Sequence, residues 1–162
     1  SGLMVTHDPE EAMSICDKVA VMNDGKIHQI DTPINLLNNP KTIFVSSFIL
    51  GNNIINLKKN GNSYISCLGE INCSEYLKNT GIKSMSISPK FISIKRSESG
   101  DAIVISKEFL GEFLIYKVSI NGNILRVRTD INNLLNNGDK CSLSINKNSY
   151  YFLYPGAYKE YI

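Results

Sequence analysis

The sequence lacks any apolar run that approaches the ~20 residues a membrane-spanning helix needs. It also lacks clustered positive charge, because 17 Lys and Arg stand against 15 Asp and Glu and the basic residues are scattered. Nucleic acids and anionic membranes are bound through clustered basic residues. The sequence therefore argues against direct membrane insertion and against nucleic-acid binding.

Paired metal-binding cysteines are missing as well. No C-x-x-C pair and no His-rich neighbourhood occurs around the four cysteines, which are Cys16, Cys67, Cys73 and Cys141. Zinc sites use such pairs, so we expect no metal site. The alternative that we favour is a set of reduced, buried or half-buried thiols in a cytoplasmic protein.

A glycine-rich phosphate loop is absent too. No G-x-x-x-x-G-K-[ST] segment occurs in the chain. In many nucleotide hydrolases the backbone N–H groups of this loop hold the phosphates of the substrate. We therefore expect that the chain alone does not hydrolyse ATP and binds no cofactor.

The most informative segment that is present lies near the start. The apolar run Leu3–Val5 predicts a strand that delivers His7 to its end. A helix should follow at once, because Asp8 suits the N-cap, Pro9 the first helical position and Glu11 the capping-box spacing. The pattern places an imidazole between a strand and the start of a helix.

The full segment reads Leu3-Met4-Val5-Thr6-His7-Asp8-Pro9-Glu10-Glu11-Ala12-Met13, and it is followed by Asp17-Lys18-Val19-Ala20-Val21-Met22-Asn23-Asp24-Gly25-Lys26-Ile27, Thr32-Pro33, Phe44-Val45 and Phe48-Ile49. This run resembles the switch-histidine end of ABC transporter ATPases. It is typical of the importer subfamily whose ATPase has an additional C-terminal regulatory domain. The LSGGQ-like signature of that family, and its strand ending in an Asp-Glu pair, do not occur here.

The resemblance implies a role for His7 in an intact ATPase. There its imidazole would reach the γ-phosphate and the attacking water, and stabilise the charge that develops during transfer. It also implies that the chain is the C-terminal part of a larger subunit, which would bind ATP and Mg. The implied partners are a second ATPase subunit, in a homodimer, and transmembrane permease subunits. The implied location is the cytoplasmic, inner face of the cell membrane.

The first 50 residues predict short helices around one hairpin. Asn23-Asp24-Gly25-Lys26 favours a type I′ turn, because Asp-Gly tolerates positive φ at both central positions. Thr32-Pro33 predicts a capped helix through Leu37, and Asn39-Pro40 predicts the start of another that ends at Gly51. Apolar residues recur at helical spacing after His7, at Ala12, Ile15, Cys16 and Val19.

From about Asn53 onwards the apolar periodicity becomes alternating, which indicates short strands. Asn60-Gly61 predicts a hairpin between Ile55–Leu57 and Tyr64–Ser66. Pro89 should interrupt a strand or place it at an edge, because proline cannot donate to a ladder. Further strands are expected at Ala102–Ile105, Cys141–Ile145 and Tyr150–Leu153.

The clearest hairpin signal is Asn121-Gly122, which we place at a turn. The cross-strand pairs that follow are Tyr116 with Val127, Lys117 with Arg126, and Val118 with Leu125. The like-charge pair is tolerable only on a solvated face, so the other pairs should face the core.

Many short strands at regular spacing indicate a small barrel or sandwich. This half also resembles the TOBE domain, an OB-like barrel appended to these ATPases, at Ile87-Ser88-Pro89-Lys90, Glu108-Phe109-Leu110-Gly111, Leu134, Gly138-Asp139 and Cys141–Ile145. Where the family commonly has Arg-Pro-Glu, this chain has Ser88-Pro89-Lys90, so the contacts of that Arg and Glu are not carried over. We expect a mainly β protein, with an OB-like (TOBE) barrel or sandwich at residues 51–162. Residues 1–50 should form an α/β remnant of the ABC ATPase domain.

Other residues with possible chemistry have structural interpretations. We expect His28 to face solvent, and Glu10 and Glu11 to favour the positive end of their helix. Proteins that bind single-stranded nucleic acid interleave basic residues with exposed aromatic platforms, whereas Phe91 is the only aromatic residue of its stretch. We therefore expect a solvated edge for the basic residues Lys90, Lys95 and Arg96. Packing is expected for most of the aromatic C-terminal residues, Tyr150, Tyr151, Phe152, Tyr154, Tyr158 and Tyr161.

The leading hypothesis is a regulatory and dimer-contacting part of an ABC importer ATPase, with a weak preference for an ion such as ferric iron over a polyamine or a sugar. One alternative is a free-standing OB-like domain that binds nucleic acid or a small anion. Another is a complete hydrolase with unfamiliar motifs. The leading hypothesis also predicts that the N-terminal arm, without an ATPase core to cover it, is poorly ordered or docks on a second copy of the chain.

Overall fold

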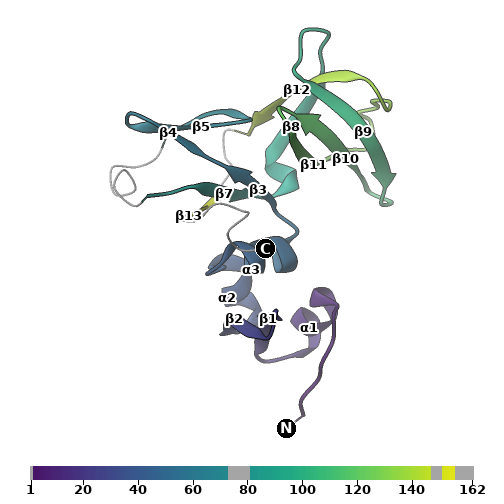
Figure 1. The fold of residues 1–162 in the computed structure, drawn as a ribbon. Helices are drawn as coiled ribbons and strands as arrows, with labels where there is room; N and C mark the ends of the chain where they lie inside the picture. Colours follow the sequence, from purple (N-terminus) through teal and green to yellow (C-terminus); the bar gives the residue numbers. More distant parts are fainter. Residues whose placement is uncertain (1, 73–80, 147–150, 156–162) are drawn as a thin grey trace.

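The computed structural model describes residues 2–72, 81–146 and 151–155 (Figure 1). The helical segments are α1 (Pro9–Ile15), α2 (Pro33–Asn38), α3 (Ile43–Leu50) and the short 3₁₀ helix η2 (Pro89–Phe91). The strands are β1 (Val19–Asn23), β2 (Lys26–Asp31), β3 (Asn53–Asn56), β4 (Lys58–Asn60), β5 (Ser63–Ser66), β6 (Gly69–Asn72), β7 (Ser84–Ile87), β8 (Ile92–Arg96), β9 (Ala102–Phe109), β10 (Phe113–Ile120), β11 (Asn123–Asp130), β12 (Lys140–Ile145) and β13 (Tyr151–Tyr154).

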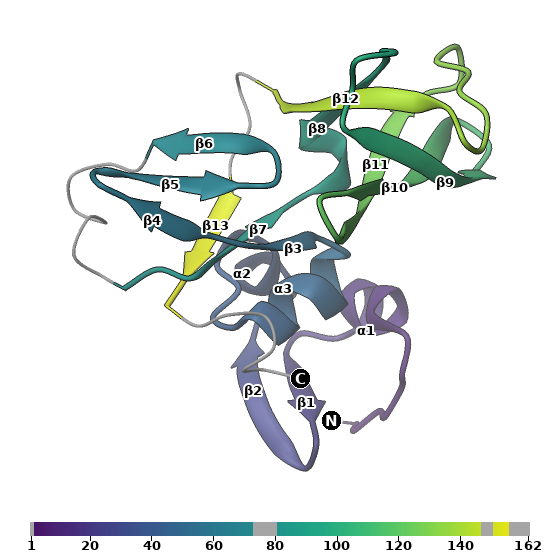
Figure 2. The same ribbon diagram turned by 45° about the horizontal axis from the view of Figure 1, so that its top comes forward.

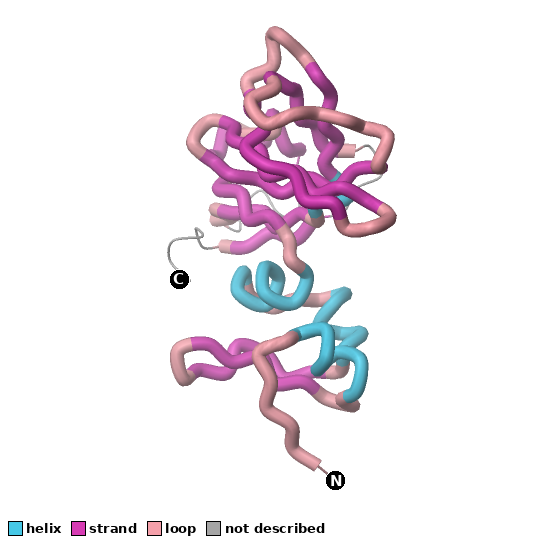
Figure 3. The backbone as a smooth tube through the Cα atoms, turned by 90° about the vertical axis from the view of Figure 1, so that its right-hand side faces the viewer, coloured by secondary structure: helices cyan, strands magenta, loops and turns pink. Residues whose placement is uncertain are grey.

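The first 50 residues form a small unit with its own apolar cluster. Its buried members are Val19, Val21, Leu36 and Val45. Figure 2 shows α2 and α3 between the β1–β2 hairpin and the strands that follow, and Figure 3 shows the same order from another side. The helices therefore connect the hairpin with the β-rich remainder of the chain.

The remainder is built from antiparallel sheets around one larger core. A five-stranded sheet has the order β11-β10-β9-β12-β8, and two three-stranded sheets have the orders β13-β7-β3 and β4-β5-β6. Strands of all three sheets bury residues in the same cluster, among them Tyr64, Met85, Tyr116 and Leu125. The prediction of a mainly β fold with a small OB-like or sandwich domain is confirmed.

Both type I′ turns form as the sequence predicts. Asp24 and Gly25 have φ values of 48° and 72°, and Asn121 and Gly122 have values of 47° and 75°. The β10–β11 register matches all three predicted pairs, Tyr116↔Val127, Lys117↔Arg126 and Val118↔Leu125. Lys117 and Arg126 are both exposed, so the like-charge pair does face solvent. The Lys117 Nζ also lies 3.4 Å from Glu108 Oε1 on the neighbouring strand.

Pro89 separates two sheets, in agreement with its predicted role as an interruption. β7 ends at Ile87 in a three-stranded sheet, η2 turns the chain, and β8 begins at Ile92 on the edge of the five-stranded sheet. Proline suits the first position of the 3₁₀ turn because its fixed φ is already helical.

Three predictions about local structure are wrong. Leu3–Val5 forms no strand, since a strand needs a neighbour and none of the described residues pairs with it. The third helix begins at Ile43 and not at Pro40, because Thr42 in place of Asn39 provides the N-cap and accepts from the Val45 amide at 3.2 Å. In the hairpin predicted at Asn60-Gly61, the strand that pairs with β5 is β4 and not Ile55–Leu57.

The last strand, predicted at Tyr150–Leu153, continues to Tyr154. β13 runs from Tyr151 to Tyr154, and Tyr150, Tyr158 and Tyr161 lie outside the described residues. The helix after Thr32 extends one residue beyond Leu37, and Gly51 ends α3 with a left-handed φ of 61°, as predicted.

The side chain of Asn53 joins two of the sheets. Its amide nitrogen donates to the carbonyl of Arg126 at 2.7 Å, and its amide oxygen accepts from the backbone N–H of Arg126 at 2.7 Å. Arg126 lies on β11, the edge strand of the five-stranded sheet, and Asn53 itself pairs with Ile87 on β7. The buried carboxamide thus provides hydrogen-bond partners for the backbone N–H and C=O of Arg126, which as groups of an edge strand would otherwise lack them.

A second group of hydrogen bonds joins the helical unit to the β region. The hydroxyls of Ser46 on α3 and Ser86 on β7 form a buried hydrogen bond, and the Asn52 amide donates to both, at 3.3 and 3.0 Å. The Tyr154 hydroxyl donates to the carbonyl of Pro40 at 3.1 Å. Burial raises the pKa of Tyr154 to about 12. These contacts hold the two parts of the chain together.

We expect Asn53→Ala to lower the free energy of unfolding by about 2 kcal/mol, because two buried hydrogen bonds are lost and each contributes roughly 1 kcal/mol. Urea denaturation followed by circular dichroism measures this change. The matched control is Asn137→Ala at an exposed turn position, which should change the stability by less than about 0.5 kcal/mol. Equal effects of the two substitutions would contradict the role given to Asn53.

We expect the stability of the chain to fall between pH 10 and 12, because the pKa of Tyr154 rises from 10.0 to about 12 on folding. In that window the unfolded chain has released the phenol proton and the folded chain still binds it, so stability decreases as pH rises. Below pH 10 both states are protonated and the contribution is complete. Urea midpoints measured from pH 9 to 12 should fall less steeply for Tyr154→Phe than for the unchanged chain. Parallel curves for the two proteins would refute this assignment.

Candidate functional site

His7 lies on the surface, immediately before α1, and its side chain is exposed. A network of side chains fixes the backbone on both sides of it. The Thr6 hydroxyl donates to Glu11 Oε2 at 2.7 Å and accepts from the Asp8 amide at 3.1 Å. Asp8 Oδ1 in turn accepts from the amides of Glu10 at 2.8 Å and Glu11 at 3.4 Å.

The capping arrangement of α1 differs in one respect from the prediction. Asp8 is the N-cap and Pro9 opens the helix, as expected. The Glu11 carboxylate, however, binds the Thr6 hydroxyl instead of the Asp8 amide, and Thr6 accepts from that amide in its place. The Thr6 hydroxyl therefore bridges the Asp8 amide and the Glu11 carboxylate, which contact each other directly in a capping box. This bridge holds His7, which lies between Thr6 and Asp8, in a defined loop.

Exposed apolar side chains lie on both sides of His7 in the sequence. The exposed fractions of Leu3, Val5 and Ile15 are 95%, 91% and 70%. More exposed apolar side chains lie on the outer face of the hairpin, at Met22, Ile27 and Ile30. Large apolar side chains exposed in such number are typical of a region that another chain or domain covers.

The predicted apolar stripe of α1 is only partly present. The helix ends at Ile15, which is exposed, so Val19 is buried from β1 and not from the helix. Ala12 and Cys16 are half-buried and pack on the cluster of the first 50 residues. The helix is therefore docked within the chain, and association of the arm with a second copy stays a prediction.

The prediction that His28 faces solvent is wrong. It is half-buried, its Nδ1 lies 3.2 Å from the Thr42 hydroxyl, and its ring centroid lies 4.9 Å from that of Phe44. Thr42 is also the N-cap of α3. His28 thus supports the start of a helix, because the hairpin folds back onto it, and a pattern of alternating residues could not show this.

The cysteines of the described ranges are reduced. Cys16 and Cys67 are half-buried and Cys141 is buried, as expected, while Cys73 lies outside these ranges. Burial raises the pKa of the Cys67 and Cys141 thiols. No group of three His, Cys, Asp or Glu residues that could hold a metal occurs in the described part of the chain. None of its helices combines the length and apolarity required for crossing a bilayer.

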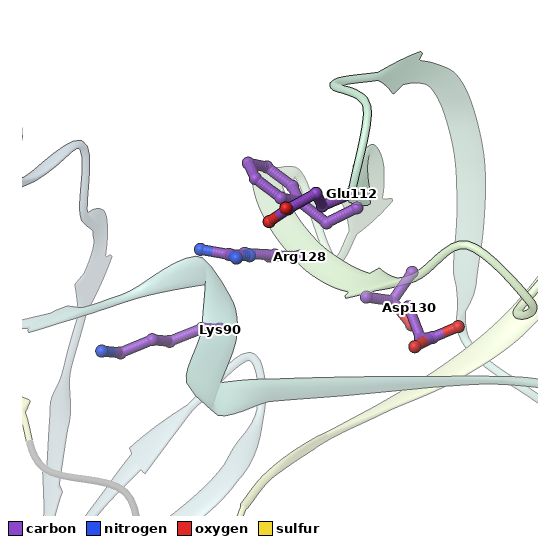
Figure 4. A pocket seen from close by; sticks show the side chains of 6 residues that line it. Lys90, Glu112, Arg128 and Asp130 are labelled. Carbon is purple, nitrogen blue, oxygen red and sulfur yellow. The ribbon is translucent and has the colours of Figure 1, made fainter.

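An open hollow of about 270 Å³ lies on the β region and was not predicted (Figure 4). Its lining residues are Lys90, Glu112, Phe113, Arg128, Thr129 and Asp130. They come from η2, the β9–β10 turn with the start of β10, and the end of β11, so no single segment of the sequence contains the pattern. The other basic residues of this region do not contribute, since Arg96 forms an ion pair with Asp139 and Lys95 is exposed outside the hollow.

Comparison with known proteins gives relatives that include several import ATP-binding proteins. The chain is 54% identical over 63 residues to the spermidine/putrescine import ATP-binding protein PotA of Bacillus anthracis, covering 39% of this chain and 18% of the relative. The proteins of the same name from Desulfitobacterium hafniense and Trichormus variabilis are 53% and 56% identical, over 33% and 32% of this chain and 15% and 14% of the relatives. No protein-family model matches the chain.

The match spans less than a fifth of the length of these relatives. Within that stretch the identity is high, and the predicted resemblance to the ATP-binding subunit of an ABC importer is confirmed. The names of the relatives refer to polyamines, so the weak preference for ferric iron is not supported.

We expect Asp8→Ala to destabilise α1 by about 1 kcal/mol, because the N-cap oxygen for the first helical amides is lost. A helix of seven residues has little stability of its own, so hydrogen exchange of the α1 amides should accelerate by roughly fivefold. The control is Asp8→Asn, whose side-chain oxygen can still cap the helix. Unchanged exchange in Asp8→Ala would contradict the capping role.

Proposed function

We propose that this chain is the C-terminal part of the ATP-binding subunit of an ABC importer for polyamines. In this proposal residues 1–50 belong to the ATPase domain, and residues 51–162 form the TOBE-type regulatory domain. The observation that carries the proposal is the identity of more than 50% to three importer ATP-binding proteins, in a chain that presents a histidine in a fixed loop before a capped helix.

The geometry of His7 fits the role of a switch histidine. Its imidazole is exposed, while Thr6, Asp8 and Glu11 hold the adjoining backbone. A side chain presented in this way can approach a nucleotide without rearrangement of its own loop, which is what preorganised stabilisation of charge requires. The residues that hold ATP and Mg would come from the remainder of the subunit, because this chain has no glycine-rich phosphate loop.

The exposed apolar side chains at residues 3–30 support the same proposal. Leu3, Val5 and the outer face of the hairpin are exposed here, and each would be covered by the remainder of an ATPase domain. Leu3–Val5 would then gain the neighbouring strands that it lacks among the described residues. The strand predicted from its sequence would form in that larger context.

The regulatory role rests on the contacts between the two parts. Ser46, Asn52 and Ser86 link α3 to the centre of a sheet, and Tyr154 links β13 to Pro40. Because these bonds are buried or half-buried, a change in the orientation of the barrel would be transmitted to α3. Contacts of the barrel with a second ATPase subunit could then bias the equilibrium between open and closed states.

The partners and the location follow from the proposed subunit. They are a second ATP-binding subunit and the transmembrane permease subunits, at the inner face of the cell membrane. Polyamines are preferred over ferric iron or a sugar as the solute, because the relatives described above are named for spermidine and putrescine.

The experiment compares His7→Ala with the unchanged residue in the longer protein that contains this chain. ATP hydrolysis should fall by roughly 10²–10³-fold, the cost of removing one preorganised group that stabilises the transition state. ATP binding should persist, because the phosphate-holding residues lie elsewhere. The isolated chain of 162 residues should show no turnover.

The matched control is His28→Gln, which removes the other histidine of the chain and should leave hydrolysis unchanged. Spermidine uptake by vesicles containing the assembled transporter should decrease together with hydrolysis in His7→Ala. Turnover by the isolated chain that depends on His7, or full activity of His7→Ala in the longer protein, would disprove the proposed function.

A further inference from the structure

We propose that Asn60 is a site of spontaneous deamidation, in which the backbone nitrogen of Gly61 attacks the Asn60 side chain in the turn between β4 and β5. The reaction needs only water and hydroxide, so this inference does not rest on the importer function. Asparagine followed by glycine is prone to it, because glycine has no side chain to hinder the attack. The chain has three such pairs, Asn60-Gly61, Asn121-Gly122 and Asn137-Gly138.

The reaction replaces the side-chain amide of Asn60 with a carboxyl group. Hydroxide removes the N–H proton of Gly61, and the resulting nitrogen anion forms a bond to Asn60 Cγ. The Cγ–Nδ2 bond breaks, and this nitrogen takes a proton from water and leaves as ammonia, which regenerates the hydroxide. Water then opens the five-membered imide at either carbonyl and gives aspartate or isoaspartate. The product therefore adds a negative charge to the turn, and isoaspartate also inserts Cβ into the backbone.

The Gly61 nitrogen is available for this attack. Asn60 and Gly61 are both exposed, and a Cβ atom placed on Gly61 would meet nothing within 4 Å. The Gly61 N–H has no hydrogen-bond partner among the described residues. The Gly138 N–H, in contrast, donates to the carbonyl of Val104 at 2.8 Å. The pair at Asn137 is therefore protected, because this bond must break before the nitrogen can react.

The turn that contains Asn60 opens more easily than the turn at Asn121. Ring closure requires rotation about the Cα–C bond of the asparagine, which disrupts either turn. β4 has three residues, all exposed, and lies at the edge of a three-stranded sheet. Asn121 instead joins two strands of eight residues that are paired along their whole length. Short exposed strands open locally with low free energies, so Asn60 should react faster than Asn121.

The Ser63 hydroxyl can stabilise the anion that forms at Gly61. It donates to the carbonyl oxygen of Asn60 at 3.0 Å, and this carbonyl belongs to the same peptide unit as the Gly61 nitrogen. The negative charge therefore spreads onto an oxygen that already has a donor, which lowers the barrier. The Asn123 side chain makes the corresponding contact to Asn121 at 3.0 Å, so the difference between these two turns rests on how easily each one opens.

Glu70 competes for the same hydroxyl. Its carboxylate also accepts a hydrogen bond from Ser63, and a hydroxyl has only one proton to donate. A carboxylate is a stronger acceptor than a carbonyl. Removal of the Glu70 carboxylate should therefore direct the Ser63 hydroxyl to the carbonyl of Asn60 and accelerate the reaction.

Peptide mapping by mass spectrometry, during incubation of the folded chain at mildly alkaline pH, tests the proposal. We expect aspartate and isoaspartate to form at Asn60 about fivefold or more faster than at Asn121 and Asn137, because local opening is easier there. The chain unfolded in urea is the reference, since all three pairs should then react at similar rates. Equal rates in the folded chain, faster conversion at Asn121 or Asn137, or no conversion at Asn60 would each overturn the proposal.

Substitutions test the role of the hydroxyl. Ser63→Ala should slow deamidation of Asn60 several-fold, and Glu70→Ala should accelerate it several-fold, each through one hydrogen bond to the developing anion. In the double variant Ser63→Ala/Glu70→Ala, acceleration through the hydroxyl is lost, whereas acceleration through a loosened turn would persist. The matched control is Glu112→Ala, which removes the same charge from an exposed turn of another sheet and should leave the rate at Asn60 unchanged.

Circular dichroism of each variant verifies that it is folded. Faster deamidation in Ser63→Ala, slower deamidation in Glu70→Ala, or the same acceleration in Glu70→Ala and the double variant would overturn the assignment of Ser63. An equal effect of Glu112→Ala and Glu70→Ala would do the same, because it would show a response to net charge alone.

Discussion

The fold of the β region depends on which partners bind the backbone N–H and C=O groups at the edge of its largest sheet. β11 is an edge strand, and the buried side chain of Asn53 pairs with both backbone groups of Arg126 as a neighbouring strand would. Asn53 also lies on β3, next to β7 in another sheet. One carboxamide therefore protects the edge and closes the sheets around their common core, which an apolar side chain at this position could not do.

This constraint also sets the position of the preceding helix. Gly51 ends α3 in a left-handed conformation two residues before Asn53, and a Cβ atom at Gly51 would lie 3.8 Å from the guanidinium of Arg126. The chain therefore leaves α3 and enters β3 directly against β11. The hydrogen bonds of Ser46 and Asn52 to Ser86 tie α3 and this short connection to β7, so the helical unit is held at two places.

Turns and helix caps could be predicted from the sequence wherever all the residues that form them are neighbours in the chain. The turn at Asn121-Gly122 formed in its predicted register, because positive φ at two positions selects one turn type. The caps at Asp8 and Thr32 formed because each binds amides within three residues. Predictions that needed a distant partner were less successful. Leu3–Val5 has no neighbouring strand among the described residues, and the environment of His28 depends on Thr42, fourteen residues away.

The loop at His7 and the hollow at Arg128 also differ in whether neighbouring or distant residues form them. The loop that presents His7 could be predicted from the sequence, because the residues that fix it are contiguous. The hollow at Arg128 could not be found, because Lys90, Phe113 and Arg128 come together only when η2 lies against the end of the hairpin. The exposed apolar side chains lie at residues 3–30, and the charged hollow lies on the β region. The two features therefore belong to separate parts of the chain, which the hydrogen bonds around α3 join.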